Sequence, residues 1–304
     1  MKMGYFPGCS MLGSSREYAE SLASVAQKLE LELEEIRDWN CCGASAAHNL
    51  NHTLSLALPA RILALAEAQQ LTDILVPCAA CYNRLAVARH ELLNNKELHS
   101  KITSIIEMEF TGTAFPRNIL EVLSTLTESG LEQHITSKFE HKVACYYGCL
   151  LVRPPAILKF DRAEDPLVMD TIMQKIGATP LDWAFKVECC GAGFSVSRTD
   201  LVAKLSQKIL DDVEHRCAEA IIVACPMCHS NLDMRRPYIE KLANKKYAIP
   251  VLYITQALGL ALGIDKTQLG LQRHFVPVPT SLQPPPPALP PPPPPPEEET
   301  NNTL

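Results

Sequence analysis

The stretch Trp39-Asn40-Cys41-Cys42-Gly43 decides how this chain is organised, and Glu188-Cys189-Cys190-Gly191 repeats its central Cys-Cys-Gly. Two adjacent thiols followed by glycine are uncommon, and the glycine allows the backbone to turn tightly beside a bulky ligand. Each pair stands between a single upstream cysteine and a downstream Cys-x-x-Cys motif. We interpret the two stretches as parts of one ligand set that occurs twice.

Working outward from the two pairs gives two sets of five cysteines, which together use ten of the 12 cysteines. The first set consists of Cys9, Cys41, Cys42, Cys78 and Cys81. The second set consists of Cys149, Cys189, Cys190, Cys225 and Cys228. Matching positions are separated by about half of the chain, so the order and spacing indicate an internal duplication.

The bulk properties favour a cytoplasmic protein that binds metal or does redox chemistry. With 304 residues, the chain can form about two domains with proper cores and does not need disulfides to compensate for small size. No apolar signal region precedes Cys9, and in a reducing compartment clustered cysteines more often bind metal than form bridges. A net charge of -6 and a pI near 5.9 argue against nucleic-acid binding. The apolar stretch 249–264 is too short to insert in a membrane.

Hydrophobic periodicity predicts an α/β fold of two pseudo-symmetric repeats, each a small, mostly parallel sheet with flanking helices. For the first repeat we predict strands over 3–7, 31–36 and 73–77, and helices over 14–29, 54–70 and 79–93. A strand over 103–108 and a helix over 118–126 are predicted next. The second repeat is predicted to have strands over 142–146, 179–183 and 220–224, helices over 166–176, 200–216 and 225–243, and a final strand and helix within 251–262.

These elements divide the chain into a first domain over 1–140, a second over 141–265 and a disordered, proline-rich tail over 266–304. Eleven of the 24 prolines lie in 284–287 and 290–296, a composition from which no core can be built. In both domains, the Cys-x-x-Cys motif lies where a predicted strand ends and a helix begins. That edge of an open α/β sheet is where ligands gather.

Three kinds of site compete for the cysteines. Structural zinc needs four ligands in a tetrahedron, so five per set is one too many, although zinc in one of the sets stays an alternative. Disulfides are disfavoured by the compartment and by the size of the chain. Iron-sulfur clusters take cysteine thiolates, and an opened cluster can use the fifth. We therefore favour two clusters.

The motifs also carry a family resemblance, which covers about residues 3–262. The residues that carry it are Tyr5-Phe6-Pro7-Gly8-Cys9, Trp39 to Ala44, Pro77 to Cys81, Tyr147-Gly148-Cys149, Glu188 to Gly193 and Cys225 to Cys228. They resemble the duplicated cysteine-rich CCG domain, and among its members the B subunit of heterodisulfide reductase. The resemblance implies that each set binds a non-cubane 4Fe-4S cluster and that all ten cysteines are ligands.

The resemblance further implies an oxidoreductase that acts on a sulfur group, methanogenesis-related through the disulfide of coenzymes M and B. A disulfide R-S-S-R′ would be reduced, or formed, between the two facing clusters. Electrons would come from the ferredoxin-like C subunit and the flavin-containing A subunit of such a complex. No flavin, nicotinamide or nucleotide motif occurs in this sequence. The alternative is an electron-relay subunit of a lactate, glycolate or fumarate-succinate oxidoreductase complex.

A few other residues near the motifs are further candidates for the site. His48 and His229 are candidate proton donors, although a solvent-facing or core histidine is the ordinary state. Arg84 and Arg153 are candidate contacts for an anionic substrate, or plain salt-bridge partners. Cys145 and Cys217 lie outside both sets, and we expect Cys145 to be a small buried hydrophobe, or else a substitute for Cys149.

Overall fold

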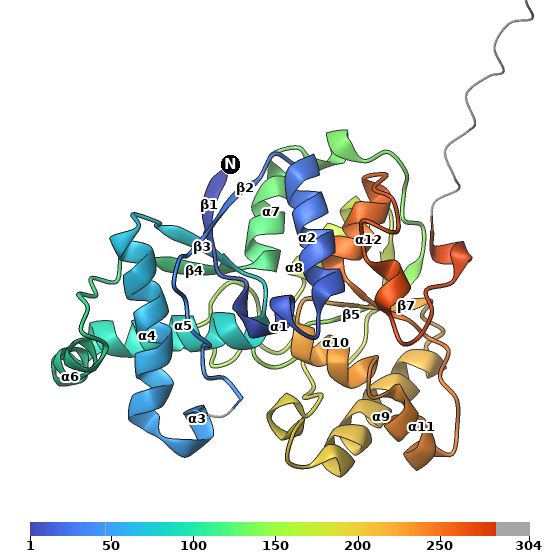
Figure 1. Cartoon of the computed structure of the whole chain (residues 1–304). Coiled ribbons are helices and arrows are strands. Elements are labelled where there is room, and N and C mark those ends of the chain that lie inside the picture. The colour runs from blue at the N-terminus through green and yellow to red at the C-terminus, as the bar shows by residue number, and fades with distance from the viewer. Residues whose placement is uncertain (46, 284–304) are drawn as a thin grey trace, which may run out of the picture.

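The computed structural model describes residues 1–45 and 47–283 and contains two four-stranded sheets. The first sheet has the strand order β2-β1-β3-β4 and the second the order β6-β5-β7-β8, and every pairing is parallel. Both halves of the chain thus have the same topology, with helices as crossover connections (Figure 1). The predicted α/β fold of two repeats is confirmed.

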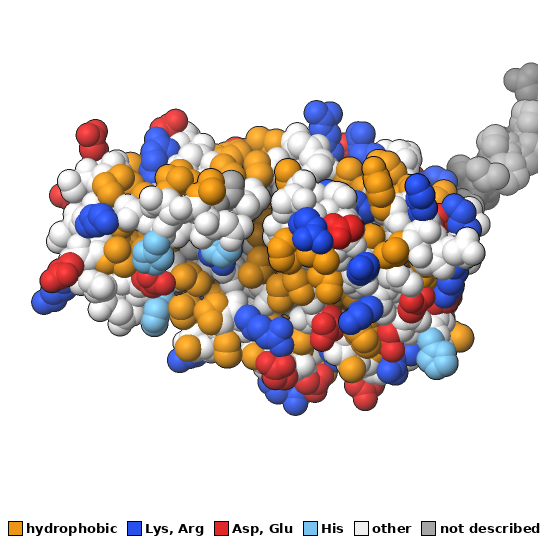
Figure 2. Space-filling model, turned by 90° about the horizontal axis from the view of Figure 1, so that it is seen from below, with side chains coloured by type: hydrophobic (Ala, Val, Ile, Leu, Met, Phe, Trp, Pro, Cys, Tyr) orange, Lys and Arg blue, Asp and Glu red, His pale blue; other side chains and the backbone are white. Residues whose placement is uncertain are grey.

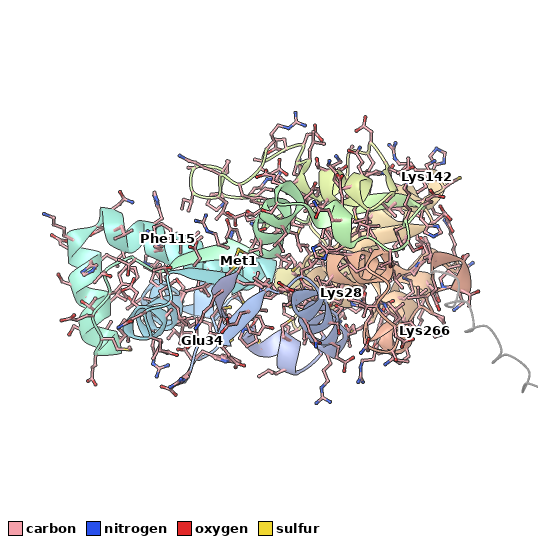
Figure 3. The ribbon with its side chains drawn as sticks, turned by 90° about the horizontal axis from the view of Figure 1, so that it is seen from above. Met1, Lys28, Glu34, Phe115, Lys142 and Lys266 are labelled. Atoms are coloured by element: carbon pink, nitrogen blue, oxygen red, sulfur yellow. The ribbon has the colours of Figure 1, made fainter. Side chains whose placement is uncertain are left out.

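The first half contains β1 (Lys2–Tyr5), α1 (Gly8–Leu12), α2 (Arg16–Lys28), β2 (Glu32–Glu35), α3 (Ala47–Leu50), α4 (His52–Ala68), β3 (Asp73–Val76), α5 (Ala79–Asn94), α6 (Lys96–Ile106), β4 (Phe115–Asn118) and α7 (Ile119–Glu128). The second half contains β5 (Lys142–Tyr146), α8 (Val168–Lys175), β6 (Thr179–Pro180), α9 (Thr199–His215), β7 (Ala220–Val223), α10 (Pro226–Leu232), α11 (Arg236–Ala243), β8 (Val251–Tyr253) and α12 (Ile254–Ala261). Seen from above, Glu34 and Phe115 lie on one side of the molecule, and Lys142 and Lys266 lie on the other (Figure 3).

The central strands are short and almost wholly buried because helices cover both faces of each sheet. β7 has the sequence Ala-Ile-Ile-Val with every residue buried, as expected for a parallel strand that is covered on both faces. At the end of β4, Asn118 and Glu121 form a capping box that starts α7. Among the described residues, no helix combines the length and apolar character that crossing a bilayer requires.

Two of the predicted elements are wrong. The strand predicted over 103–108 overlaps α6, where Asn95 caps the helix by accepting a hydrogen bond from the backbone N–H of Leu98 (3.0 Å) and Ile102 packs inward. The β-branched residues of this segment suggested a strand, but tertiary packing outweighs that weak preference. The single helix predicted over 225–243 is two helices, since Pro237 in the first turn of α11 cannot continue a helix from α10.

The two halves interlock through their helices. The last helix of the second half, α12, packs against α2, and the last helix of the first half, α7, packs against α8 (Figure 1). At the first of these contacts, the rings of Tyr18 and Tyr253 stack with centroids 4.1 Å apart. The hydroxyl oxygens of Ser21 and Thr255 lie 2.7 Å apart at the same contact. Each half therefore completes its core with a helix from the other.

Residues 266–283, which the sequence analysis placed in the tail, pack against both halves. Leu269, Leu271 and Leu282 are buried, because this segment still carries apolar side chains that the later proline runs lack. Arg273 donates two hydrogen bonds to the carboxylate of Glu20 on α2, at 2.9 and 2.7 Å. The rest of the predicted tail, 284–304, lies outside the described residues.

Replacing Leu269 with alanine is expected to lower the free energy of unfolding by about 2–5 kcal/mol, the usual cost of a cavity in a packed core. Leu269 is fully buried and lies directly over Gly259 of α12, which has no side chain to fill the space. Urea denaturation checks this. The exposed Lys266, replaced with alanine, is the control, and an equal loss in both variants would contradict packing of the segment.

Candidate functional site

All ten cysteines of the two sets follow the carboxyl ends of strands. Cys9 lies in α1 after β1, and Cys149 follows β5 at the matching position. Cys78 and Cys225 are the N-cap residues of α5 and α10, directly after β3 and β7. Parallel strands bring their carboxyl ends to one edge of a sheet, so residues far apart in the sequence meet there.

In the first set, the Sγ atoms of Cys42 and Cys81 lie 3.1 Å apart. The backbone N–H of Gly43 donates to the Sγ of Cys41 (3.5 Å), a contact that the positive φ of this glycine allows. Cys42, Cys78 and Cys81 are buried, whereas Cys9 and Cys41 are exposed. The set is therefore closed on one side and open to solvent on the other.

The second set repeats this arrangement. The Sγ atoms of Cys190 and Cys228 lie 3.7 Å apart, and the N–H of Gly191 donates to the Sγ of Cys189 (3.3 Å). Cys190, Cys225 and Cys228 are buried, and Cys189 is exposed. Seen from below, hydrophobic side chains gather along the boundary between the two halves (Figure 2).

The two sets approach each other at Cys78 and Cys225. Cys225 raises the pKa of Cys78, whereas Cys228 and Cys78 lower the pKa of Cys225. Tyr18 lies beside Cys78, since its hydroxyl donates a hydrogen bond to the carbonyl of the preceding residue, Pro77. Cysteines from both halves thus lie near one another, which the spacing of the motifs alone did not predict.

The thiols within each set shift one another's pKa values. Hydrogen bonds from Cys41 and Cys81 lower the pKa of Cys42, and the hydrogen bond with Cys42 raises the pKa of Cys41. In the second set, a hydrogen bond from Cys149 lowers the pKa of Cys189 to about 6. Neighbouring thiolates repel one another, so the sulfurs of one set ionise together only around cations. Five sulfur donors suit an iron-sulfur cluster.

Two glycines leave room against the sulfur atoms. A Cβ on Gly8 would lie 3.2 Å from the Sγ of Cys81, and one on Gly148 would lie 2.9 Å from the Sγ of Cys228. Both glycines have positive φ, at 69° and 67°. These glycines directly precede Cys9 and Cys149, so in each half a glycine backbone lies close to a sulfur atom of the set.

Replacing Gly148 with alanine is expected to cost about 1–2 kcal/mol from the left-handed backbone alone, and to lower the metal content of the protein. The added Cβ would also press on the Sγ of Cys228. The matched control is alanine at Gly193, where a Cβ meets no atom within 4 Å. Metal content and thermal unfolding of both variants check this. Equal losses in the two variants would argue against a requirement for glycine next to the sulfur atom.

Five of the six other candidate residues lie in ordinary environments, and Arg84 is partly buried. His229 is buried between Tyr253 and His274, and burial lowers its pKa, so it is neutral. His48 is exposed. Arg153 pairs with Glu164 at 2.8 Å. The remaining two cysteines also stay apart from the sets: Cys145 is buried beside Asp170 and Lys186, as expected for a small hydrophobe, and Cys217 is exposed.

A second group of potential ligands, His229, Asp233 and His274, has ligand atoms within 4.8 Å of one another. Gln256 argues against a metal there. Its Oε1 accepts from the N–H of Tyr253 (2.9 Å), so its amide nitrogen donates to Nε2 of His274 (2.8 Å). His274 therefore carries its hydrogen on Nδ1, the atom that would have to face the metal. We interpret this group as a hydrogen-bonded anchor for the segment around His274.

Two asparagines that sequence reasoning missed hold the cysteine loops in place. Asn83 donates from Nδ2 to the carbonyls of Leu150 (3.1 Å) and Arg153 (2.6 Å), and so ties α5 to the loop that follows Cys149. Asn231 donates to the carbonyl of Cys190 (3.1 Å). Both follow the last cysteine of a set within one helical turn, a spacing that could have drawn attention to them.

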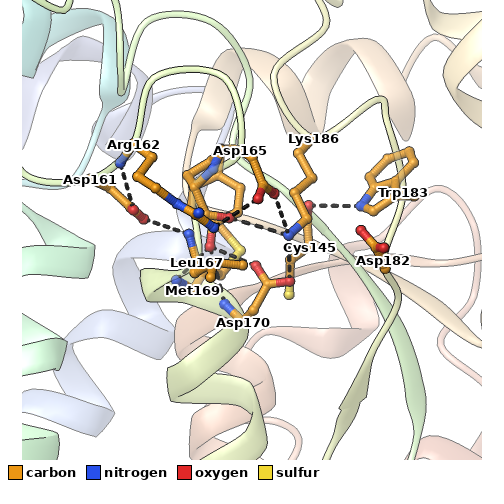
Figure 4. Close-up of polar contacts among 12 residues, drawn as sticks. Cys145, Asp161, Arg162, Asp165, Leu167, Met169, Asp170, Asp182, Trp183 and Lys186 are labelled. Atoms are coloured by element: carbon orange, nitrogen blue, oxygen red, sulfur yellow. Dashed lines mark hydrogen bonds and ion pairs between the residues drawn. The ribbon is translucent and has the colours of Figure 1, made fainter.

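A buried ion pair stabilises the backbone that leads into the second set. The side chain of Lys186 is 3% exposed, and its Nζ lies 2.9 Å from Oδ1 of Asp170. Tyr147 donates to Oδ2 of the same carboxylate (2.6 Å), and Figure 4 shows the surrounding network. The carbonyl of Lys186 accepts hydrogen bonds from the N–H groups of Tyr147 and Gly148. The network therefore fixes the backbone that leads into Cys149.

Comparison with known proteins identifies relatives over nearly the whole chain. The chain is 31% identical over 279 residues to the 8-methylmenaquinol:fumarate reductase membrane anchor subunit of Wolinella succinogenes, a match that covers 90% of this chain and 97% of that protein. It is also 31% identical over 287 residues to the B subunit of the ferredoxin/F(420)H(2)-dependent CoB-CoM heterodisulfide reductase of Methanosarcina acetivorans, with 90% and 94% covered. The resemblance to the B subunit of heterodisulfide reductase is thereby confirmed.

A crystal structure of a hypothetical protein from Helicobacter pylori matches with a TM-score of 0.70 at 15% identity, over 91% of this chain and 52% of that one. At that identity the match concerns the fold alone. The model of the cysteine-rich CCG domain matches residues 3–86 and 143–233, and each segment contains one five-cysteine set. The chain therefore belongs to the family of proteins with a duplicated cysteine-rich CCG domain.

Proposed function

We propose that the chain is the disulfide-reducing subunit of a heterodisulfide reductase-type complex, with a non-cubane 4Fe-4S cluster in each five-cysteine set. The observation that carries the proposal is that the loops of the two sets meet: Asn83, two residues after Cys81, donates hydrogen bonds to the carbonyls of Leu150 and Arg153, which follow Cys149. All ten cysteines would be ligands. The relatives that are B subunits of heterodisulfide reductases support an oxidoreductase role.

The pairing of two sets suits the electron count of the reaction. R-S-S-R′ needs two electrons and two protons to give R-SH and R′-SH, and iron-sulfur clusters supply electrons one at a time when bound. Two adjacent sites can serve one S-S bond without releasing a sulfur radical. The buried cysteines of both sets would exclude water from one side, and the exposed Cys9, Cys41 and Cys189 mark the side open to substrate.

The electrons would come from other proteins. The sequence carries no fingerprint for flavin or nicotinamide, so the ferredoxin-like C subunit and the flavin-containing A subunit of such a complex are the proposed partners. A relay subunit of a fumarate reductase-type complex is the second candidate, favoured by the relative from Wolinella succinogenes. A relay passes electrons on without binding a thiol, and this difference can be measured.

The test is anaerobic purification with iron, sulfide and zinc measured per chain, followed by EPR of the oxidised protein with and without candidate thiols. We expect about eight irons, four for each cluster, and a paramagnetic signal that changes when thiol is added. About eight irons without a response to thiols would favour the relay. About four irons with one zinc and no response would overturn the two-cluster mechanism.

A further inference from the structure

The duplication places different side chains at matching positions beside the two sets. Arg84 follows Cys81 by three residues, and Asn231 follows Cys228 by three residues. In both cases the cysteine and the later residue lie on one helix, α5 or α10, at a spacing that puts them on the same face. Arg84 and Asn231 are therefore counterparts, one cationic and one neutral.

Asn231 presents a neutral amide to the second set. Its Nδ2 lies 3.1 Å from the carbonyl of Cys190 and 3.5 Å from the Sγ of the same residue. Its Oδ1 accepts hydrogen bonds from Ser195 (3.0 Å) and from Nε of Arg235 (3.1 Å). The amide thus stands between the guanidinium of Arg235 and the sulfur.

Arg84 presents a positive charge to the first set. It is partly buried, its Nη2 donates to Oδ1 of Asn83 (2.7 Å), and among residues 1–45 and 47–283 no carboxylate forms an ion pair with it. It lies one helical turn beyond Cys81 on α5, on the same face of the helix as that cysteine. An unpaired, half-buried guanidinium is costly unless it serves a neighbouring charge.

We propose that Arg84 makes the two sites unequal, so that the first set holds the cluster with the higher midpoint potential and receives the first electron. This inference rests on the proposed function. Reduction adds negative charge, which a nearby cation in a medium of low dielectric constant stabilises. Net charge and hydrogen bonds to sulfur set the potentials of iron-sulfur clusters. A hydrogen bond with a charged partner is about twice as strong as a neutral one.

The experiment is a redox titration of the anaerobically purified protein, followed by EPR, for the wild type, R84K, R84Q and R89Q. R84Q is expected to lower the higher of the two midpoint potentials by about 59 mV and to leave the lower one unchanged. For a one-electron reduction, this shift is a tenfold change in the equilibrium constant. R84K is expected to keep most of the wild-type value. Arg89 lies on the same helix but donates to the carbonyl of Gly112, so R89Q is the matched control and should change neither potential.

Four outcomes would overturn the inference. If R84Q has normal iron content and its potentials are unchanged, or if both potentials shift equally, Arg84 does not make the sites unequal. Either result leaves the proposed function intact. A shift of the lower potential alone would assign Arg84 to the wrong site. A wild-type protein without cluster iron would overturn the proposed function and this inference with it.

Discussion

Serine in place of Cys81 is expected to empty the first site of iron while the second keeps its own, and serine in place of Cys228 is expected to do the reverse. The Sγ of Cys81 lies 3.1 Å from the Sγ of the buried Cys42, and the Sγ of Cys228 lies 3.7 Å from the Sγ of the buried Cys190. Loss of a ligand should cost more affinity than the roughly 10–100-fold typical of partners in the outer shell. Disulfide reduction should disappear in both variants, because the reaction needs an electron from each site.

Iron and acid-labile sulfide per chain measure this prediction, and circular dichroism shows whether the variants stay folded. Serine at Cys217, which is exposed and outside both sets, is the control and should leave the iron content unchanged. If Cys81→Ser and Cys228→Ser both keep full iron, the ligand assignment is wrong. If either one empties both sites, the two sets assemble as a single unit.

Methionine in place of Lys186 is expected to lower the free energy of unfolding by about 3–5 kcal/mol at neutral pH, because it leaves the buried carboxylate of Asp170 without its cation. The two side chains are 3% and 9% exposed. Lys175 pairs with Glu132 on the surface, with 48% and 56% exposed, so Lys175→Met should have little effect and serves as the control.

The effect of Lys186→Met should depend on pH in a defined direction. Burial already raises the pKa of Asp170 above its unfolded value, and removing the lysine raises it further. A carboxyl group with a raised folded pKa is favoured in its protonated form, so the loss in stability should shrink as the pH falls from 7 through that pKa. Urea titrations at about pH 7 and about pH 5 measure this. A loss that stays constant would assign it to packing instead of charge.

The sequence allowed the repeated fold and the grouping of the cysteines to be predicted because both depend on local patterns. The strand at 220–224 is continuously apolar, and its Cys-x-x-Cys motif follows at once. Helix α6 and the packed segment 266–283 were not predicted, since their placement depends on contacts with distant residues. Arg273, for example, pairs with Glu20, which is 253 residues away.

In the candidate site, too, local features could be predicted and contacts between the halves could not. Which cysteines belong together could be predicted from spacing, and the structure brings Cys42 to Cys81 and Cys190 to Cys228. The approach of Cys78 to Cys225 depends on how the two sheets are placed, which no spacing within one half contains. Lys186 and Asp170 were also not anticipated, because a lysine in a loop and an aspartate in the first turn of a helix give no sign that they will be buried together.

The exchange of helices between the halves, α12 onto α2 and α7 onto α8, has the pattern of a two-fold symmetric dimer. In an isologous interface, both partners present the same surface to each other. A single-copy precursor could have formed this pair only with identical residues at both sites. Joining two copies in one chain removes that restriction, so one site can carry arginine where the other carries asparagine, and a symmetric pair becomes a directional one.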